Sequence, residues 1–311
     1  MASEYPNLEE YLKYENAELF DLYAETWTQY PVISQFKVIT TPKESDEFPV
    51  LMAFPKASFR EENMGKENTI ASTEKRRFSK RFLDGSWLAD GKSVMSHPQG
   101  VTYALFHEAS THFAGMMLGL EKAVIYGDSE EGEGDLEGSF DGLIKLAKED
   151  GRIETVDNPT GVGEQPLYTA IFVDRSKVKL LGQAEGFKVG QIERQLTNIF
   201  PTKDGKKGSN WVYAQSIEAY LGMMCGSSQG IYVVKAHVFT DSILRFILAK
   251  KFFVGNKPDM LIMSTLGHES LRLSRAPSAY SPTGEPPEVA SIAGIPITIT
   301  DAMVDETVTI P

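Results

Sequence analysis

The chain has 311 residues and a formal net charge of −12, with the apolar and charged fractions of an ordinary soluble globular protein of about two domains. The acidic balance disfavours tight binding to duplex DNA, and the single cysteine, Cys225, excludes an intramolecular disulfide and a cysteine-rich zinc site. No apolar run approaches the ~18 residues of a membrane span and the N-terminus is acidic, so we expect no membrane anchor, no signal peptide and a cytoplasmic origin.

The N-terminal part is predicted to be an arm followed by a ribbon. Apolar spacing predicts an amphipathic, strongly acidic helix over 7–27, and prolines favour an extended arm over 30–47. Strands at 48–54 and 77–88, joined by a polar tip with a basic cluster, predict a two-stranded ribbon. A ribbon of this length is marginal alone in water, so we expect it to lie on another surface, and the acidic helix is complementary to it in charge.

A long helix is predicted in the middle of the chain, at about 100–126. Its apolar residues recur at three- and four-residue steps and share one face: Leu105, Ala109, Phe113, Met116, Leu120 and Val124. Gly127 is expected to end the helix in the left-handed conformation, and a glycine-rich acidic loop follows it.

Beyond this helix the pattern alternates between strands and helices. Tyr168–Asp174 is predicted to be a strand, with 177–181 as its partner across a short turn. Further strands are expected at 187–200, 209–224, 231–237, 259–264 and 292–300, and helices at 240–253 and 265–275. A mixed α+β body is therefore expected.

Catalytic and metal-binding signatures are nearly absent. His107 and His112 share the central helix but are five residues apart, which projects them about 140° apart, whereas a helical zinc pair needs a spacing of four. The segment from Gly85 to Ser93 has one residue too many for a phosphate-binding loop. The acidic loop that starts at Asp128 lacks the calcium-loop glycine, and Cys225 is best explained as a small buried hydrophobe.

A predicted arm and ribbon that are not stable alone can be stabilised by contacts with neighbouring copies of the chain. This arrangement is typical of a subunit of a self-assembling shell. Three stretches then resemble the major capsid proteins of tailed bacteriophages, whose fold is shared with the herpesvirus capsid floor and encapsulins. They are Phe54–Gly65 with Thr69 and 71–73, Ile125–Asp128 with Phe140–Leu143, and Ala293–Ile297 with Asp301–Met303.

The resemblance implies four parts. An N-terminal arm would span 1–45 and an extended loop 46–95. A peripheral domain with the long spine helix would comprise 96–164 and 183–236, and an axial domain 165–182 and 237–311. Since the sequence starts at Met1, we expect a separate scaffolding protein rather than a cleaved scaffolding segment.

The function implied is assembly into pentamers and hexamers of an icosahedral shell that encloses packaged DNA without gripping it, with no catalysis, cofactor or membrane. The partners implied are a portal protein and a scaffolding protein, with a decoration protein as a further candidate. The shell would assemble in the host bacterial cytoplasm. The candidates for contacts between subunits are Lys66, Lys75, Arg76, Arg77, Arg81, Glu9, Glu10, Glu18, Asp21 and Trp27.

Three alternatives stay open at this stage. An encapsulin-like compartment would share the fold, and an enzyme or metal-binding protein would use His107 and His112. Some related capsids join lysine to asparagine covalently, which Lys56, Lys66 or Lys75 could do with Asn158 or Asn256.

Overall fold

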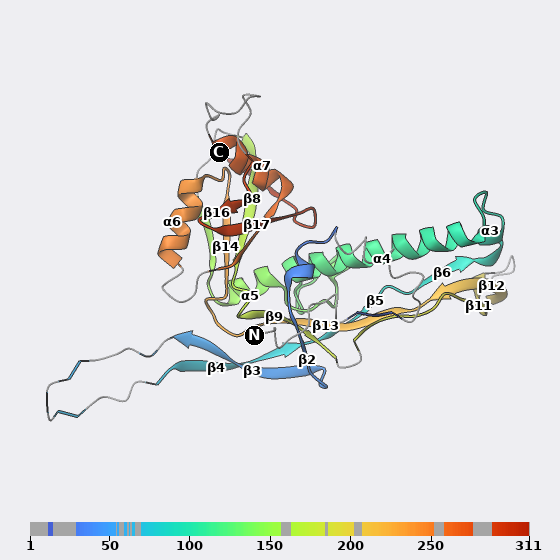
Figure 1. Ribbon diagram of the computed structural model, residues 1–311, viewed down its shortest axis with the longest axis horizontal. Coiled ribbons are helices and arrows are strands. Elements are labelled where there is room, and N and C mark those ends of the chain that lie inside the picture. The colour runs from blue at the N-terminus through green and yellow to red at the C-terminus, as the bar shows by residue number, and fades with distance from the viewer. Residues whose placement is uncertain are drawn as a thin grey trace.

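The computed structural model describes residues 12–14, 29–53, 55, 59–60, 62, 64–65, 70–156, 163–183, 186–201, 207–251, 258–275 and 288–310. They form an elongated body along helix α4 (Val101–Tyr126), a compact body at one end of that helix, and a ribbon that projects away from it (Figure 1). The expected mixture of helices and strands is confirmed. None of the described helices is long and apolar enough to span a membrane.

The elongated body is α4 packed on a six-stranded sheet. Its strands run in the order β1 (Leu12–Tyr14), β10 (Phe187–Val189), β13 (Ile217–Cys225), β9 (Val178–Gly182) and β2 (Val38–Thr40), with β5 (Arg81–Asp84) also paired to β13. The predicted apolar face of α4 is confirmed, because Ala109, Phe113, Met116, Leu120 and Val124 are buried. Phe113 meets Phe187 of the sheet edge-on at 6.4 Å between ring centroids.

The glycine after α4 ends the helix for a different reason from the one expected. Gly127 has φ −52° and ψ 139°, which is not the left-handed conformation. A Cβ at this position would collide with the carbonyl oxygens of Phe140 and Ala123, so glycine is needed for the close return of the chain. The return leads through a short 3-10 turn (Gly134–Leu136) to α5 (Leu143–Glu149).

At its far end the elongated body carries a small three-stranded sheet. Strands β11 (Glu193–Pro201), β12 (Lys207–Gln215) and β6 (Trp87–Asp90) lie in that order, and the short helix α3 (Gly91–Met95) follows β6. The strands predicted over 187–200 and 209–224 are therefore each divided into two.

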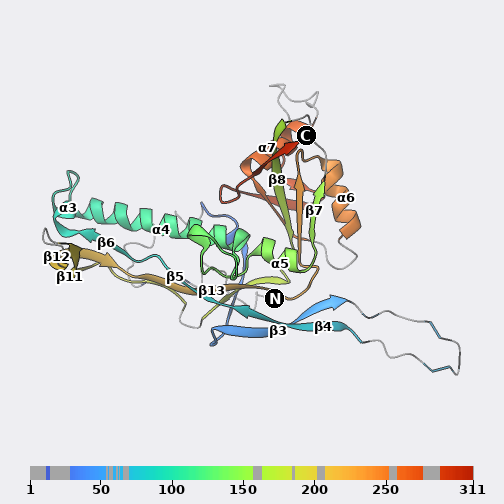
Figure 2. The ribbon, with the colours of Figure 1, turned by 180° about the vertical axis from the view of Figure 1, so that it is seen from behind.

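The compact body is a seven-stranded sheet with α6 (Asp241–Lys251) and α7 (Thr265–Ser274) (Figure 2). Its strands run in the order β16 (Ser291–Ile292), β17 (Ile295–Thr300), β15 (Met260–Ser264), β8 (Gly163–Val173), β14 (Ile231–Ala236) and β7 (Ile153–Val156), with β18 (Glu306–Ile310) also paired to β8. Ala170 and Phe172 join the core with α6 and α7, whereas Ile171 and Val173 join the core with α4. Burial on both faces explains the continuous apolar run in β8.

The ribbon consists of β3 (Ser45–Ala53) and β4 (Ser72–Ser79), which pair antiparallel as a two-stranded sheet. The segment predicted as one return strand over 77–88 is divided among β4, β5 and β6, which belong to three different sheets.

Strand pairing differs from the expectations in three further places. β9 pairs with β13 and β2 rather than with β8, so the hairpin expected between 168–174 and 177–181 is wrong. β14 pairs with β8, although the expected boundary placed the two in different domains. Leu12–Tyr14 form a strand inside the segment predicted as helix 7–27, and the rest of that helix lies outside the described residues.

Candidate inter-subunit surfaces

The ribbon carries three of the predicted contact residues on β4. Lys75 and Arg77 are exposed, opposite Pro49 and Glu47 of β3, and Arg77 Nε donates a hydrogen bond to Ser45 Oγ at 2.9 Å. Arg76 points to the opposite side because neighbouring residues of a strand alternate. Lys75 and Arg77 are therefore available to a neighbouring molecule.

Arg76 is held inside the subunit instead. Its side chain is 17% exposed, and Nη2 lies 2.7 Å from Oδ1 of Asp150, which follows α5 and is 6% exposed. Nε also lies 3.3 Å from Glu74 Oε2. The prediction that Arg76 contacts a neighbour stays untested, but its position indicates that it fixes the ribbon to its own body.

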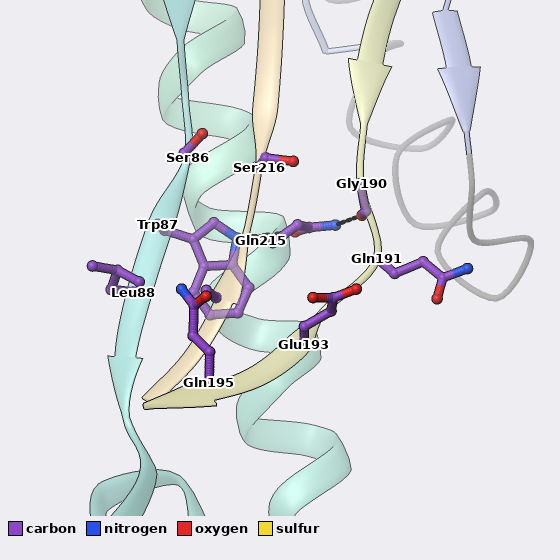
Figure 3. Close-up of a pocket in the computed structure, with 10 residues that line it drawn as sticks. Ser86, Trp87, Leu88, Gly190, Gln191, Glu193, Gln195, Gln215 and Ser216 are labelled. Carbon is purple, nitrogen blue, oxygen red and sulfur yellow. Dashed lines mark hydrogen bonds between the residues drawn. The ribbon is translucent and has the colours of Figure 1, made fainter. Parts of the chain in front are cut away.

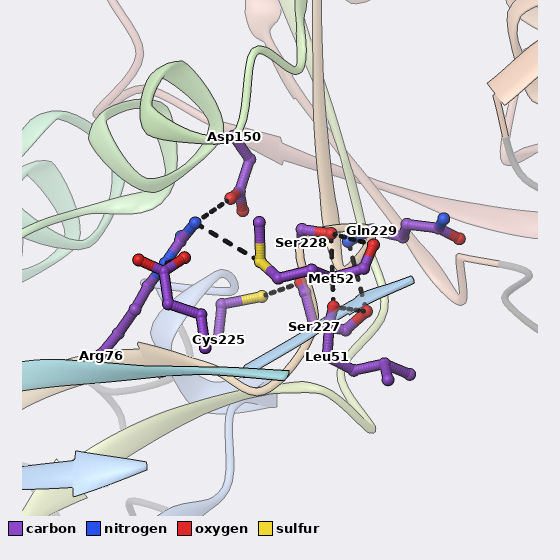
Figure 4. A network of polar contacts seen from close by, with 9 residues as sticks. Leu51, Met52, Arg76, Asp150, Cys225, Ser227, Ser228 and Gln229 are labelled. Atoms are coloured by element: carbon purple, nitrogen blue, oxygen red, sulfur yellow. Dashed lines mark hydrogen bonds and ion pairs between the residues drawn. The ribbon is translucent and has the colours of Figure 1, made fainter. Parts of the chain in front are cut away.

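The far end of the paired strands is bonded through Leu51 to the turn between β13 and β14 (Figure 4). The Leu51 N–H donates to Gly226 O at 3.1 Å, and the Ser228 N–H donates to Leu51 O at 3.1 Å. Cys225 lies beside this turn, and burial raises the pKa of its thiol to about 12. A thiol with this pKa is protonated at neutral pH, which agrees with the expected role in packing.

A buried lysine closes the base of the ribbon, at the opposite end of the paired strands. Lys80 lies between β4 and β5, and its ammonium group donates to Thr41 O at 2.7 Å and Gly182 O at 3.3 Å, with Asp46 Oδ2 at 3.9 Å. Burial lowers the pKa of Lys80. A Cβ at Gly222 would lie 2.6 Å from Ser79 O, so the absence of a side chain there lets this corner pack against β13.

A buried carboxylate joins the two bodies and the arm segment around Ile33. Glu121 of α4 is fully buried and accepts hydrogen bonds from Thr300 Oγ1 and from the Ile33 N–H. Burial raises the pKa of Glu121, although these donors act in the opposite direction. Nearby, Tyr30 donates to Ala114 O at 2.8 Å.

A polar cleft lies where the elongated body passes into the three-stranded sheet (Figure 3). Three pairs of consecutive strands break at the same position along the body: β5 ends and β6 begins, β10 ends and β11 begins, and β12 ends and β13 begins. Trp87 Nε1 donates to Gln215 Oε1 at 2.9 Å, and Gln215 Nε2 donates to Gly190 O at 2.9 Å. These two hydrogen bonds connect the strands across the position where they break. The spacing of Trp87, Gly190 and Gln215 in the sequence does not identify them as partners.

The predicted metal candidates do not converge. His112 stacks on Trp87 at 5.7 Å between ring centroids, whereas His107 stacks on Tyr103. Asp128 accepts the backbone N–H groups of the acidic loop and forms an ion pair with Lys145 at 3.1 Å. No group of three or more metal-binding side chains is placed to hold an ion in the described part of the chain.

The segment from Gly85 to Ser93 is a helix start rather than an anion site. Asp90 caps α3, and its carboxylate accepts the N–H groups of Lys92 and Ser93 at 2.8 and 3.1 Å. A carboxylate already occupies the place that a phosphate would need.

The remaining predicted contacts are divided between surface and undescribed positions. Arg81 is exposed on β5. Lys66 and the arm candidates Glu9, Glu10, Glu18, Asp21 and Trp27 lie outside the described residues, as do the cross-link candidates Lys56, Asn158 and Asn256.

The distal part of the ribbon has an apolar feature that the sequence analysis missed. Phe59, Met64 and Ile70 are 107%, 60% and 86% exposed. Single apolar residues in a polar segment are common, so only their shared position beyond the paired strands distinguishes them.

No family model and no curated protein matches this sequence. Among solved structures, the chain is similar to one of bacteriophage epsilon15, with a TM-score of 0.56 and 14% identity over 89% of this chain and 88% of that one. It is also similar to the capsid of bacteriophage JBD30 decorated with minor capsid protein trimers, with a TM-score of 0.47 and 10% identity over 86% and 88%. The resemblance found in the sequence is confirmed at the level of the fold, since this chain shares the fold of the bacteriophage epsilon15 structure.

Proposed function

We propose that this chain is the major capsid protein of a tailed double-stranded DNA bacteriophage. In this role it assembles as pentamers and hexamers into an icosahedral shell around packaged DNA. The observation that carries the proposal is the fold shared with the epsilon15 structure over nearly the whole of both chains. The role is structural rather than catalytic.

The shape of the subunit supports assembly. The paired strands β3 and β4 have little stability of their own in water and are bonded to the body at Lys80, Arg76 and Leu51. Phe59 and Ile70 lie near the end of the ribbon and expose most of their surface. A neighbouring copy that covers these side chains would remove apolar surface from water and hold the ribbon in place. Many such modest contacts, made at once, give a stable shell.

Charge suggests which parts of the ribbon meet a neighbour. Lys75, Arg77 and Arg81 are exposed on a chain whose net charge is −12, so an acidic surface of another copy is a suitable partner. The acidic residues of the arm remain candidates for this surface. The same negative charge suits a container that encloses DNA without binding it tightly.

The proposal includes further partners and a location. A portal protein and a scaffolding protein would act with the shell, and a decoration protein is a further candidate partner. Assembly would take place in the cytoplasm of the host bacterium, and the finished protein would be part of the virion.

Electron microscopy of the purified chain tests the proposal. We expect closed shells, and a chain that stays monomeric in the presence of its scaffolding protein would contradict it. Lys75→Glu with Arg77→Glu should reduce the yield of shells at least tenfold while the circular dichroism spectrum is unchanged. Lys148→Glu, an exposed charge reversal on α5, is the matched control and should assemble normally.

A further inference from the structure

The buried carboxylate of Glu121 lies where α4, the arm segment 30–36 and the end of β17 meet. Its side chain is inaccessible to solvent, and it accepts hydrogen bonds from Thr300 Oγ1 and, at 3.4 Å, from the Ile33 N–H. All of these donors are neutral. Neutral donors replace only part of the hydration that an ionised carboxylate loses on burial, so an ionised Glu121 is costly at this junction.

No group around Glu121 favours its ionisation by an opposite charge. Burial raises the pKa of Glu121, and the negative charge of Asp301 acts in the same direction, although the hydrogen bonds to the carboxylate oppose both. From the arm, Tyr30 is a neutral neighbour, because burial and the Glu121 carboxylate raise the pKa of its phenol. From α7, Thr265 is uncharged, and none of the described residues that line the adjoining cleft is cationic.

Segment 30–36 depends on this carboxylate for its local structure. It contains the 3-10 turn η2 (Ile33–Gln35), whose start has no hydrogen bond from a nearby capping side chain. Glu121 supplies that acceptor from α4, 88 residues away in the sequence. The segment also connects the two bodies, since Tyr30 donates to an α4 carbonyl at 2.8 Å and Gln35 Nε2 donates to Thr298 of β17 at 2.9 Å.

We propose that Glu121 is a proton-dependent switch, whose protonated form holds segment 30–36 between α4 and the compact body and whose ionised form releases it. Loss of the proton puts a negative charge beside Asp301 with no cation to balance it. A cleft of about 440 Å³ adjoins Glu121, so water can hydrate the carboxylate once the segment moves. In the open junction the carboxylate ionises near its ordinary pKa of 4.5, and rising pH therefore favours opening. This control of the arm goes beyond assembly of a shell.

Hydrogen exchange of the full, unassembled chain tests the switch, after each rate is corrected for the intrinsic effect of pH. The Phe36 N–H donates to Ile33 O at 3.3 Å within the segment, and the Gly142 N–H donates to Gly127 O at 2.8 Å in the body. As pH rises above 4.5, protection of the Phe36 amide should fall in total by about tenfold for each unit by which the folded pKa of Glu121 exceeds that value. The Gly142 amide should keep its protection. Glu121→Gln, which stays neutral, should show no such fall.

Asp301→Asn provides a second test that leaves Glu121 in place. Asp301 is exposed and accepts a hydrogen bond from Thr265 Oγ1 at 2.7 Å, which the amide oxygen of asparagine can also accept. Without the neighbouring negative charge, ionised Glu121 costs less in the closed junction, so the fall in Phe36 protection should be smaller than in wild type.

Three results would overturn the switch: equal falls in wild type and Glu121→Gln, an equal fall at Gly142, or a fall in Asp301→Asn as large as that in wild type. If Glu121→Gln does not fold, the comparison of Asp301→Asn with wild type decides the case alone. Because the chain is measured unassembled, these results are independent of whether it forms shells.

Discussion

Lys80 should hold the base of the ribbon, and its replacement by methionine tests this. Methionine is similar in length and apolar, so it fills the space but donates no hydrogen bond. The carbonyl oxygen of Thr41 would lose this donor and Asp46 would lose the neighbouring cation, whereas Gly182 O would keep the N–H of Thr41 as a donor. The side chain of Lys80 is fully buried, so water cannot replace these bonds without opening the structure.

The magnitude follows from these contacts. Each buried acceptor left without a donor costs about 1–3 kcal/mol. Removal of one partner from a buried ion pair costs about 3–5 kcal/mol. Burial lowers the pKa of Lys80, which means that the buried ammonium charge itself costs free energy. Removal of this charge offsets part of the loss. We expect Lys80→Met to destabilise the ribbon base by about 3 kcal/mol, and each 1.4 kcal/mol is about tenfold in an equilibrium, so local opening should become about 100-fold more frequent.

Amide hydrogen exchange measures this opening locally. The N–H of Thr41 donates to Gly182 O at 2.9 Å, and the N–H of Lys80 donates to Glu44 O at 2.7 Å, so both amides report on the same corner. Both should lose about 100-fold of their protection in Lys80→Met. Lys75→Met, an exposed change on the same strand, is the control and should leave them unchanged. Protection that falls less than threefold in Lys80→Met would refute the reasoning.

Three further predictions concern the body. Burial raises the pKa of Glu121, so its stabilising contribution is present below the pKa of the unfolded chain and is lost as pH rises through the folded pKa. Wild type should therefore lose stability relative to Glu121→Gln as pH rises above the ordinary carboxyl pKa of 4.5. Parallel denaturation midpoints above this pH would contradict it. Phe113→Ala should cost about 3–5 kcal/mol in urea unfolding, because the ring is fully buried against Phe187. In a double-mutant cycle, Arg76→Met and Asp150→Asn should each destabilise the chain, and the pair should cost less than the sum, since the ion pair is largely buried; strict additivity would exclude the coupling.

The local sequence pattern was sufficient to predict the elements in which buried residues recur at a regular spacing. The apolar positions of α4 recur over 26 residues, so most of its buried face was predictable, although Leu105 is only partly buried and the buried Met117 and Ile125 were missed. The division of β12 from β13 was not, because Ser216 interrupts the pairing without a proline or a glycine at that position. The partner of β9 was also missed, since a short turn favours a hairpin whereas the actual partner β13 is distant in sequence.

The sequence showed which residues of the candidate surfaces carry a charge, but not which way their side chains point. The basic cluster 75–81 was visible in the sequence, yet only strand alternation and the position of Asp150 show that Arg76 faces its own body while Lys75 and Arg77 do not. Lys80, within this cluster, looks like one more surface cation in the sequence. Its role depends on Thr41 and Gly182, which are far from it along the chain.

The ribbon acts mechanically as a lever whose pivot is its base. β3 has nine residues, and at about 3.3 Å per residue its length is about 30 Å. A rotation of about 5° at Lys80, beside the start of β3, would move the far end of this strand by roughly 2.5 Å, close to the length of a hydrogen bond. The two Leu51 bonds, near that far end, oppose this movement. The bonds at the two ends of the paired strands thus limit how far the ribbon can follow a neighbour when the angle between subunits differs from place to place in the proposed shell.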